Sequence, residues 1–257
     1  MSEQYETSGY VTIPEGTLYY KIYGRKEEKK VPVLLLHGNR GSHKDFSSYI
    51  KALKEAGCLV IAMDSRGHGA SVLRGSMLKR RITAADMAED VVCLLDRLQL
   101  KKAVLLGFSD GANTALEFGA DYPQRALKII AVSANALPDG LIRPMYLMEE
   151  ARSWLAGMLE KLYPKGKMGE WCRKQQFFCG LILHSPYLTQ KRLAGIKVPV
   201  LLMAGTKDLI KESHSRWMAG CIPHSRLVLI KGGTHQGFFR RKEQYMETII
   251  EYITKKD

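Results

Sequence analysis

The sequence lacks the segments that would place this protein in a membrane or outside the cell. None of its apolar runs approaches the ~20 residues that a transmembrane helix requires. The polar N-terminal stretch MSEQYETSGYVTIPEG has neither the basic start nor the apolar segment of a secretory signal. We therefore expect a cytoplasmic protein with no membrane span.

Cysteine is scarce, and its spacing is not that of a metal or redox site. The chain has five cysteines among 257 residues, and no two of them form a C-x-x-C pair. Most lie in apolar stretches such as GCLVIAM and VVCLLDRL, which favours reduced, buried thiols. Because no cluster of ligating residues appears either, we expect no metal and no organic cofactor.

Positive charge is abundant, but the patterns that accompany nucleic-acid binding are missing. The formal net charge of +13 would attract nucleic acids, anionic membrane surfaces and acidic partners alike. The basic cluster Lys79-Arg80-Arg81 is short and has no interleaved aromatic residues, and no helix-turn-helix, zinc-finger or RNA-recognition signature is present. Nucleic-acid binding is therefore not expected.

Apolar runs and helical patterns alternate along most of the chain. The runs 9–13 and 18–24 flank a turn at Pro14 and predict a hairpin. Further strands are predicted at 31–38, 58–64, 102–109, 126–134, 198–205 and 226–232, with helices at 45–57, 83–100, 110–123, 211–221 and 245–256. This alternation predicts an α/β fold, with a mostly parallel, twisted sheet of eight strands flanked by helices on both faces.

The alternation stops between Pro138 and Lys197, where no strand pattern is found. Two helical stretches occupy this segment instead. The first repeats apolar residues at helical spacing (Met148, Ala151, Leu155, Met158 and Leu162), and the second is MGEWCRKQQFFCGLIL. We interpret 138–197 as a helical cap inserted into a core domain formed by 1–137 and 198–257, and we expect it to cover one end of the sheet.

The stretch GFSDG places one serine between two glycines, after an apolar strand and before a helix. Gly107, Ser109 and Gly111 fit G-x-S-x-G, the nucleophile elbow, in which strand and helix pass so closely that the flanking residues must be small. The alternative is a glycine-containing turn in which Ser109 caps the helix. The strand before the motif and the helix after it favour the elbow.

A serine hydroxyl becomes a nucleophile when a histidine takes its proton and an acid orients that histidine. In the elbow's usual fold the chain order is serine, acid, histidine. Asp208 in AGTKDLI and His235 in KGGTHQGF stand in that order, each just after an apolar strand. Asp208 could instead cap the next helix and His235 could be a plain loop residue, but we expect both to be catalytic. The remaining candidate histidines, which we expect to be solvated, are His184, His214 and His224.

Catalysis through serine also requires two donors aimed at the oxyanion. One is expected to be the backbone amide of Asp110, at the first turn of the helix after the serine. The other is expected in the loop HGNRGS, at the backbone amide of Asn39. In the alternative interpretation, His37-Gly38 forms only a tight turn.

These motifs together resemble the α/β-hydrolase superfamily. LLLHGNRGS, DSRGHGAS, GFSDGA, AGTKD and GGTHQ fall in the family's order and cover about residues 9–256. The Ser-Asp pair in GFSDGAN is similar to that of valacyclovir-hydrolase-like esterases. The resemblance implies that Asp64, Arg66 and His68 stabilise the loop after the fourth strand. The HGN loop resembles that of haloalkane dehalogenases, but those carry an aspartate where this chain has Ser109, so dehalogenation and epoxide opening are not expected.

The residues and the resemblance predict a serine hydrolase that cleaves small carboxylic esters or thioesters through an acyl-serine intermediate. Three alternatives use the same fold: a cofactor-free perhydrolase or haloperoxidase, a carbon-carbon bond hydrolase, and a noncatalytic ligand-binding protein. The first two would use the same three residues, whereas a binding protein would tolerate their loss. Since all three residues are present, an enzyme is favoured.

The cap is expected to contribute apolar residues to a substrate pocket. We select Trp154, Met158 and Phe178 as candidates, and ordinary helix packing is the alternative. The cap segment also holds ten Lys or Arg residues and five Asp or Glu residues, so positive charge is denser there than elsewhere. This charge could steer anionic acyl substrates toward the site, or it could simply mark solvated helix faces.

Overall fold

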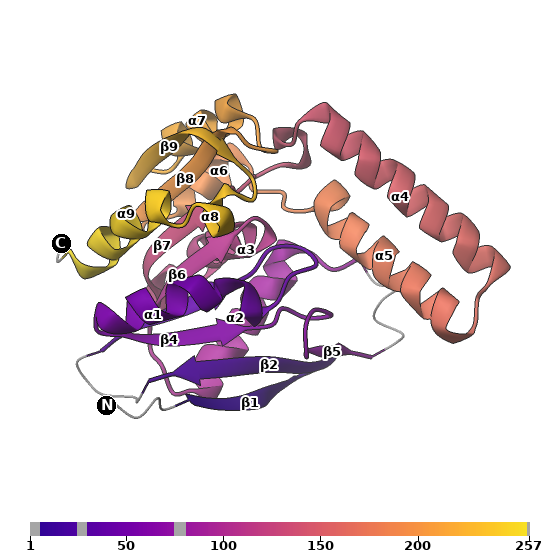
Figure 1. The fold of residues 1–257 in the computed structure, drawn as a ribbon, viewed down its shortest axis with the longest axis horizontal. Coiled ribbons are helices and arrows are strands. Elements are labelled where there is room, and N and C mark those ends of the chain that lie inside the picture. Colours follow the sequence, from indigo (N-terminus) through magenta and orange to yellow (C-terminus); the bar gives the residue numbers. More distant parts are fainter. Residues whose placement is uncertain (1–5, 25–29, 75–80, 256–257) are drawn as a thin grey trace.

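One sheet organises the chain, and its strands lie in the order β1-β2-β4-β3-β6-β7-β8-β9 (Figure 1). The computed structural model describes residues 6–24, 30–74 and 81–255. The strands are β1 (Glu6–Ile13), β2 (Gly16–Tyr23), β3 (Val31–Leu36), β4 (Cys58–Met63), β6 (Ala103–Phe108), β7 (Ala126–Val132), β8 (Val200–Lys207) and β9 (Ser225–Thr234). Strand β2 pairs antiparallel with β1 and β4, and the pairs from β4–β3 to β8–β9 are parallel. The predicted sheet is confirmed, and the two-residue strand β5 (Val72–Leu73) adds an unexpected pairing with β2.

Helices cover both faces of the sheet because its central strands are apolar on both sides. Successive side chains of a strand point to opposite faces, so Val33 and Leu35 of β3 belong to one core while Leu34 and Leu36 belong to the other. The first core is completed by α1 (Ser47–Glu55) and α9 (Glu243–Thr254). The second is completed by α2 (Ala84–Arg97), α3 (Asp110–Asp121) and α7 (Glu212–Cys221).

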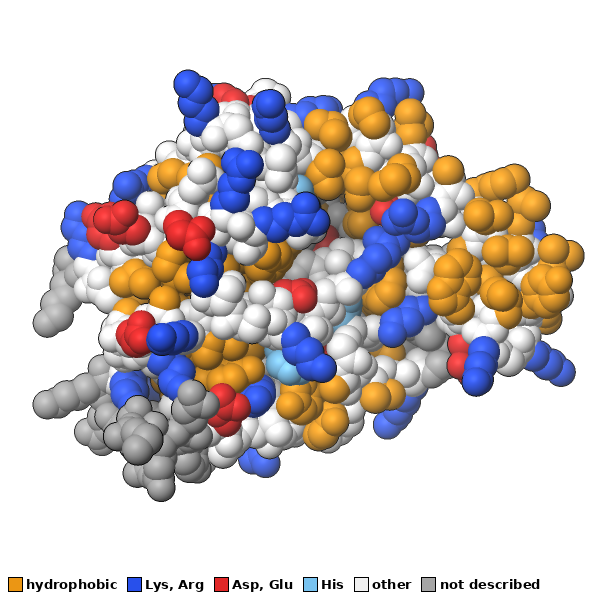
Figure 2. Space-filling model, in the orientation of Figure 1, with side chains coloured by type: hydrophobic (Ala, Val, Ile, Leu, Met, Phe, Trp, Pro, Cys, Tyr) orange, Lys and Arg blue, Asp and Glu red, His pale blue; other side chains and the backbone are white. Residues whose placement is uncertain are grey.

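Between β7 and β8 the chain leaves the sheet and forms two long helices. Helices α4 (Arg143–Leu162) and α5 (Gly166–His184) pack against each other and extend away from the layers of the sheet (Figure 1). We call this pair the α4–α5 hairpin. The short helix α6 (Gln190–Gly195) then returns to the body, where Leu193 and Ile196 are buried in the core. Figure 2 shows hydrophobic side chains gathered on the surface at the hairpin end of the molecule.

Several expectations concern segments outside the described residues. Lys79 and Arg80 of the basic cluster and residues 1–5 of the polar N-terminus belong to this group, as does the predicted extension of the last helix to residue 256. Within the described part, the last helix ends at Thr254. No helix among the described residues is long and apolar enough to cross a membrane.

Candidate active site

Ser109 stands between β6 and α3 in a backbone conformation that serine rarely adopts. Its φ and ψ are 53° and −120°, and a positive φ is strained for a residue with a side chain. Its backbone N–H donates to the carbonyl of Val132 at 2.9 Å, which joins the turn to β7. The Ser109 side chain makes no capping hydrogen bond to α3. The capping alternative is therefore wrong, and the turn presents the hydroxyl instead.

The two glycines of the motif are required because backbones approach closely there. A Cβ atom on Gly107 would lie 2.2 Å from the carbonyl oxygen of Gly111, and one on Gly111 would lie 2.1 Å from that of Leu36. Atoms at these distances would overlap, so any side chain would push α3 away from β6 and β3. The G-x-S-x-G spacing thus follows from how tightly the helix crosses the strand ends.

The structure brings together the serine, histidine and aspartate that the sequence predicted. His235 follows β9, and its Nε2 lies 3.2 Å from Ser109 Oγ. Its Nδ1 lies 2.6 Å from Oδ1 of Asp208, which follows β8. Asp208 does not cap α7, whose N-cap is Lys211. This relay of two hydrogen bonds is the geometry in which a histidine acts as general base toward a serine.

Asp208 is held as a carboxylate by more than the histidine. Ser133 Oγ donates to its Oδ2 at 2.6 Å, and the amides of Gly205 and Ile210 approach its two oxygens at 3.3 Å. Burial alone would raise the pKa of Asp208, but the hydrogen bond and charge of His235, with the bonds from Ser133 and Ile210, outweigh it and lower that pKa. The acid is therefore kept charged beside the imidazole.

The sequence analysis did not identify Ser133. It directly follows β7 and has a positive φ of 55°. The apolar pattern predicts a strand over 126–134, whereas β7 ends at Val132, so Ser133 lies just outside the strand. A polar residue at the carboxyl end of an apolar run was the available signal.

Asn39 and Asp110, the expected oxyanion donors, are joined to each other through their side chains. Asn39 Nδ2 donates to Asp110 Oδ2 at 2.7 Å and to the carbonyl of Phe178 on α5 at 2.9 Å. Asp110 is the first residue of α3, so its backbone N–H has no partner within the helix. The Asn39 side chain thus fixes its loop against the turn that carries Ser109.

A small cavity lies beside the first turn of α3. Its lining residues are Ala84, Met87, Asp110, Asn113, Leu181, Ser185 and Pro186. Burial raises the pKa of the Asp110 carboxyl, and the hydrogen bond from Asn39 partly opposes that rise. The cavity therefore combines one carboxyl group next to the serine with apolar atoms from α2 and α5.

The loop that contains Asn39 is also joined to α4, through Arg40. Arg40 donates from its Nη2 to Oε2 of Glu149 at 3.0 Å, and Arg152 and the thiol of Cys179 bind the two oxygens of that carboxylate. The Glu149 side chain is fully buried. Arg40 has a positive φ of 61°, which turns the loop toward the hairpin. The hairpin and the loop beside Ser109 therefore share one buried ionic cluster.

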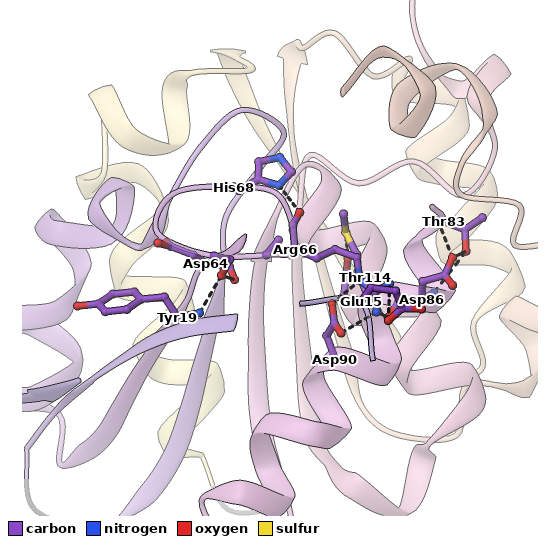
Figure 3. Close-up of polar contacts among 12 residues, drawn as sticks. Glu15, Tyr19, Asp64, Arg66, His68, Thr83, Asp86, Asp90 and Thr114 are labelled. Carbon is purple, nitrogen blue, oxygen red and sulfur yellow. Dashed lines mark hydrogen bonds and ion pairs between the residues drawn. The ribbon is translucent and has the colours of Figure 1, made fainter. Parts of the chain in front are cut away.

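A second polar network supports the loop after β4 (Figure 3). Arg66 forms two hydrogen bonds with Asp90 of α2, at 2.6 and 2.7 Å. Asp64 accepts from the backbone of His43 and of Ala70. His68 approaches the Arg66 carbonyl through Nδ1, and burial lowers its pKa to about 3. These contacts fit the stabilising role that the resemblance implies.

The three cap candidates occupy different environments. Phe178 is 6% exposed and packs on His68, and its carbonyl binds Asn39. Trp154 and Met158 are 66% and 42% exposed on α4, so neither is buried in the helix interface.

One of the histidines expected to be solvated is not. His214 accepts a hydrogen bond from the Ala136 amide at its Nε2, at 3.0 Å, and its ring packs against that of Trp217 at a tilt of 41°. Burial lowers its pKa. His184 and His224 are exposed, as expected.

A mostly parallel sheet with a Ser-His-Asp relay at the carboxyl ends of its strands is the arrangement of a hydrolase. A family model described as the alpha/beta hydrolase fold matches residues 31–163, and the chain belongs to this family. The predicted resemblance and fold class are thereby confirmed.

Relatives with curated names are hydrolases of several kinds. A putative carbamate hydrolase, RutD of Caulobacter vibrioides, is 35% identical, with 92% of this chain and 95% of that protein covered. Serine hydrolase BPHL of Mus musculus is 28% identical, covering 96% of this chain and 86% of that protein. Among solved structures, the enol-lactonase from Burkholderia xenovorans LB400 has a TM-score of 0.76 at 22% identity, covering 96% of this chain and 100% of that one.

Proposed function

We propose that this protein is a serine hydrolase that cleaves carboxylic esters or thioesters through an acyl-serine intermediate. The observation that carries the proposal is the position of His235, with Nε2 3.2 Å from Ser109 Oγ and Nδ1 2.6 Å from Asp208. These two contacts hold His235 between the serine hydroxyl and the carboxylate, which is the position that a general base requires.

In the proposed reaction, His235 takes the proton of Ser109 as its oxygen attacks the substrate carbonyl. The oxyanion is stabilised by the backbone amides of Asp110 and Asn39, and α3 adds its N-terminal dipole. The protonated imidazole then gives its proton to the departing alcohol or thiol. A water molecule, deprotonated by His235, then attacks the acyl-serine and releases the acid. In both steps Asp208 stabilises the imidazolium.

Two further observations support an acyl-transfer reaction. The strained φ of Ser109 and the missing capping bond leave its hydroxyl free to face His235. The relatives named above include a serine hydrolase and a putative carbamate hydrolase. Phe178 and the cavity beside Asp110 are the proposed apolar contacts for substrate.

The test is covalent labelling with a fluorophosphonate together with hydrolysis of short-chain p-nitrophenyl esters. We expect labelling at Ser109, and a fall in kcat/KM on the order of 10³- to 10⁶-fold for S109A and H235A. Undiminished hydrolysis by S109A, or a folded wild type that the probe does not label, would refute the proposal.

A panel of substrates would then define the bond that is cleaved. It should contain esters of increasing acyl length, matching thioesters, lactones, carbamates and aminoacyl amides. Bromination by peroxide and acetate should be measured beside it, because structures named as bromoperoxidases share the fold. We expect ester or thioester hydrolysis to exceed bromination, and the reverse order would favour the perhydrolase alternative.

A further inference from the structure

The outer face of the α4–α5 hairpin is apolar and uncovered. On α4, Leu147, Trp154, Met158 and Leu162 recur at intervals of seven, four and four residues, which places them in one stripe along the helix. Their exposed fractions are 46%, 66%, 42% and 68%. In α4 only Glu149 and Ala156 are buried. The helix therefore presents its apolar stripe to solvent rather than to the core.

Helix α5 continues this surface. Met168 and Trp171, one turn apart on α5, are 48% and 49% exposed. We call the six residues Leu147, Trp154, Met158, Leu162, Met168 and Trp171 the hairpin surface. Figure 2 shows the gathering of hydrophobic side chains at this end of the molecule, with Lys and Arg side chains around it. Soluble proteins rarely leave so many large apolar side chains together in water without a binding role.

The turn of the hairpin adds unpaired positive charge to this apolar surface. Lys161, Lys165 and Lys167 are exposed in or beside the connection between the two helices. Within the described residues none of these three forms a salt bridge, whereas Arg173 nearby is paired with Glu160. The surface thus combines apolar and aromatic side chains with ammonium groups that have no carboxylate partner.

We propose that the hairpin surface binds an anionic lipid bilayer, lying in its interface without crossing it. Helices that bind in this way have an apolar face with tryptophan and leucine, flanked by lysines that contact anionic headgroups. Tryptophan suits this position because its ring is apolar and its N–H is polar. The net positive charge of the chain argues against a second copy of it as the partner. Each copy carries a net charge of +13 and the same unpaired lysines, so two copies repel each other while an anionic membrane attracts both.

The position of the hairpin gives this binding a direct relation to the candidate active site. The base of α4 holds Arg40 through Glu149, and α5 holds Asn39 through the Phe178 carbonyl. A bilayer that binds the hairpin therefore lies next to the segment that is joined to the loop beside Ser109. The inference concerns binding, and it holds whether or not the proposed reaction is correct.

The test is flotation of the purified full chain with vesicles of phosphatidylcholine, with and without added phosphatidylglycerol, at low and at high salt. Tryptophan emission and its quenching by brominated lipid should be recorded in parallel. We expect binding to the anionic vesicles only, a blue shift of the emission, and quenching. Exposed Leu162 and Trp171 allow a double variant, L162S/W171S, which should bind at least about tenfold more weakly, since it removes two large apolar groups.

Matched charge variants separate a specific surface from general attraction by a basic protein. K161Q/K165Q/K167Q should lower vesicle affinity on the order of 100-fold, because each of the three lysines near an anionic surface contributes about fivefold. K101Q/K102Q/K191Q removes the same charge from exposed positions outside the hairpin and should bind nearly as the wild type does. Far-UV circular dichroism and thermal unfolding should confirm that every variant is folded.

Three outcomes would overturn the proposal. The first is a wild type that does not bind anionic vesicles, and the second is equal loss of binding in the two lysine variants. The third is a stable dimer, measured by light scattering, that L162S/W171S converts to a monomer. That last result would assign the hairpin surface to a second copy of the chain.

Discussion

Ser133 Oγ donates to Asp208 Oδ2 at 2.6 Å, so the acid that orients His235 is itself oriented from the neighbouring strand β7. The two carboxylate oxygens of Asp208 have different partners. Oδ1 binds the imidazole of His235, and Oδ2 accepts from the hydroxyl of Ser133, a residue with a positive φ at the end of β7. The orientation of the histidine therefore depends on two strands rather than one.

Removing the Ser133 hydroxyl should weaken catalysis without abolishing it. S133A leaves one oxygen of Asp208 without its short hydrogen bond, so we expect kcat to fall roughly 5- to 50-fold, with little change in KM. The measurement is steady-state kinetics on a short-chain ester. As a control, S225A removes a hydroxyl that binds the Ala219 carbonyl, and it should leave kcat unchanged. A KM effect alone in S133A would indicate a role in substrate binding.

Replacing Asp208 by asparagine should cost more, because an amide can present the wrong partner to His235 Nδ1. We expect kcat to fall on the order of 10⁴-fold in D208N. Since the pKa of Asp208 is lowered in the folded state, its charge stabilises the fold above the unfolded pKa of about 4, and this contribution is lost as pH falls. Denaturant unfolding should therefore show the wild type losing stability relative to D208N as the pH is lowered through that range. A gap between the two proteins that is constant with pH would contradict this assignment.

Glu149 should hold the hairpin to the rest of the molecule. E149Q keeps the size of the side chain but leaves Arg40 and Arg152 without their buried carboxylate. Because both guanidinium groups are partly exposed, we expect a loss of about 1–3 kcal/mol in unfolding free energy. Faster tryptic cleavage within 143–184 should accompany it. E170Q, at an exposed position on α5, is the control and should behave as the wild type in both measurements.

Glu117 should make stability fall as pH rises. This carboxyl on α3 is 3% exposed, and burial raises its pKa to about 7 despite Arg192 at 2.8 Å. The folded state therefore binds the Glu117 proton more tightly than the unfolded state. The protonated carboxyl contributes fully to the free energy of unfolding below about pH 4.5, and this contribution is lost as pH rises toward 7. Relative to the wild type, E117Q should gain roughly 1–3 kcal/mol between those pH values.

The Glu117 prediction is checked by thermal or urea unfolding at several pH values. E247Q, at an exposed position on α9, should keep a constant difference from the wild type. A pH-independent difference between E117Q and the wild type would show that folding does not raise the pKa of Glu117.

The sheet and the Ser-His-Asp arrangement could be predicted from the sequence because both leave local signals. Buried parallel strands are continuous apolar runs, and Ser109 and Asp208 directly follow two of them. His235 follows the edge strand β9, which is partly exposed but contains the apolar run 227–230. The elbow also has a steric requirement, since Gly107 and Gly111 must lack side chains where backbones nearly touch. The residues that meet this requirement lie within two positions of Ser109, so the motif can be detected in a single sequence.

The contacts between distant segments left no comparable signal. Arg40 and Glu149 are 109 residues apart, and nothing in either local pattern identifies the partner. Helical spacing predicted helix α4, but the predicted repeat shares only Met158 and Leu162 with the exposed stripe, and a period shows only that a helix has an apolar face. Whether the core, a partner or water covers that face depends on where the hairpin is placed, and this is set by tertiary contacts. His214 was misjudged for the same reason, since its partner is the distant Ala136 amide.

Ser109 and His235 are separated by 126 residues, and they meet only when β8 and β9 have joined the edge of the sheet. A chain emerging from the ribosome can therefore complete its serine turn long before the base arrives. Until then the Ser109 hydroxyl has no imidazole beside it. For the proposed reaction, the serine therefore gains its base only with the last parallel strand.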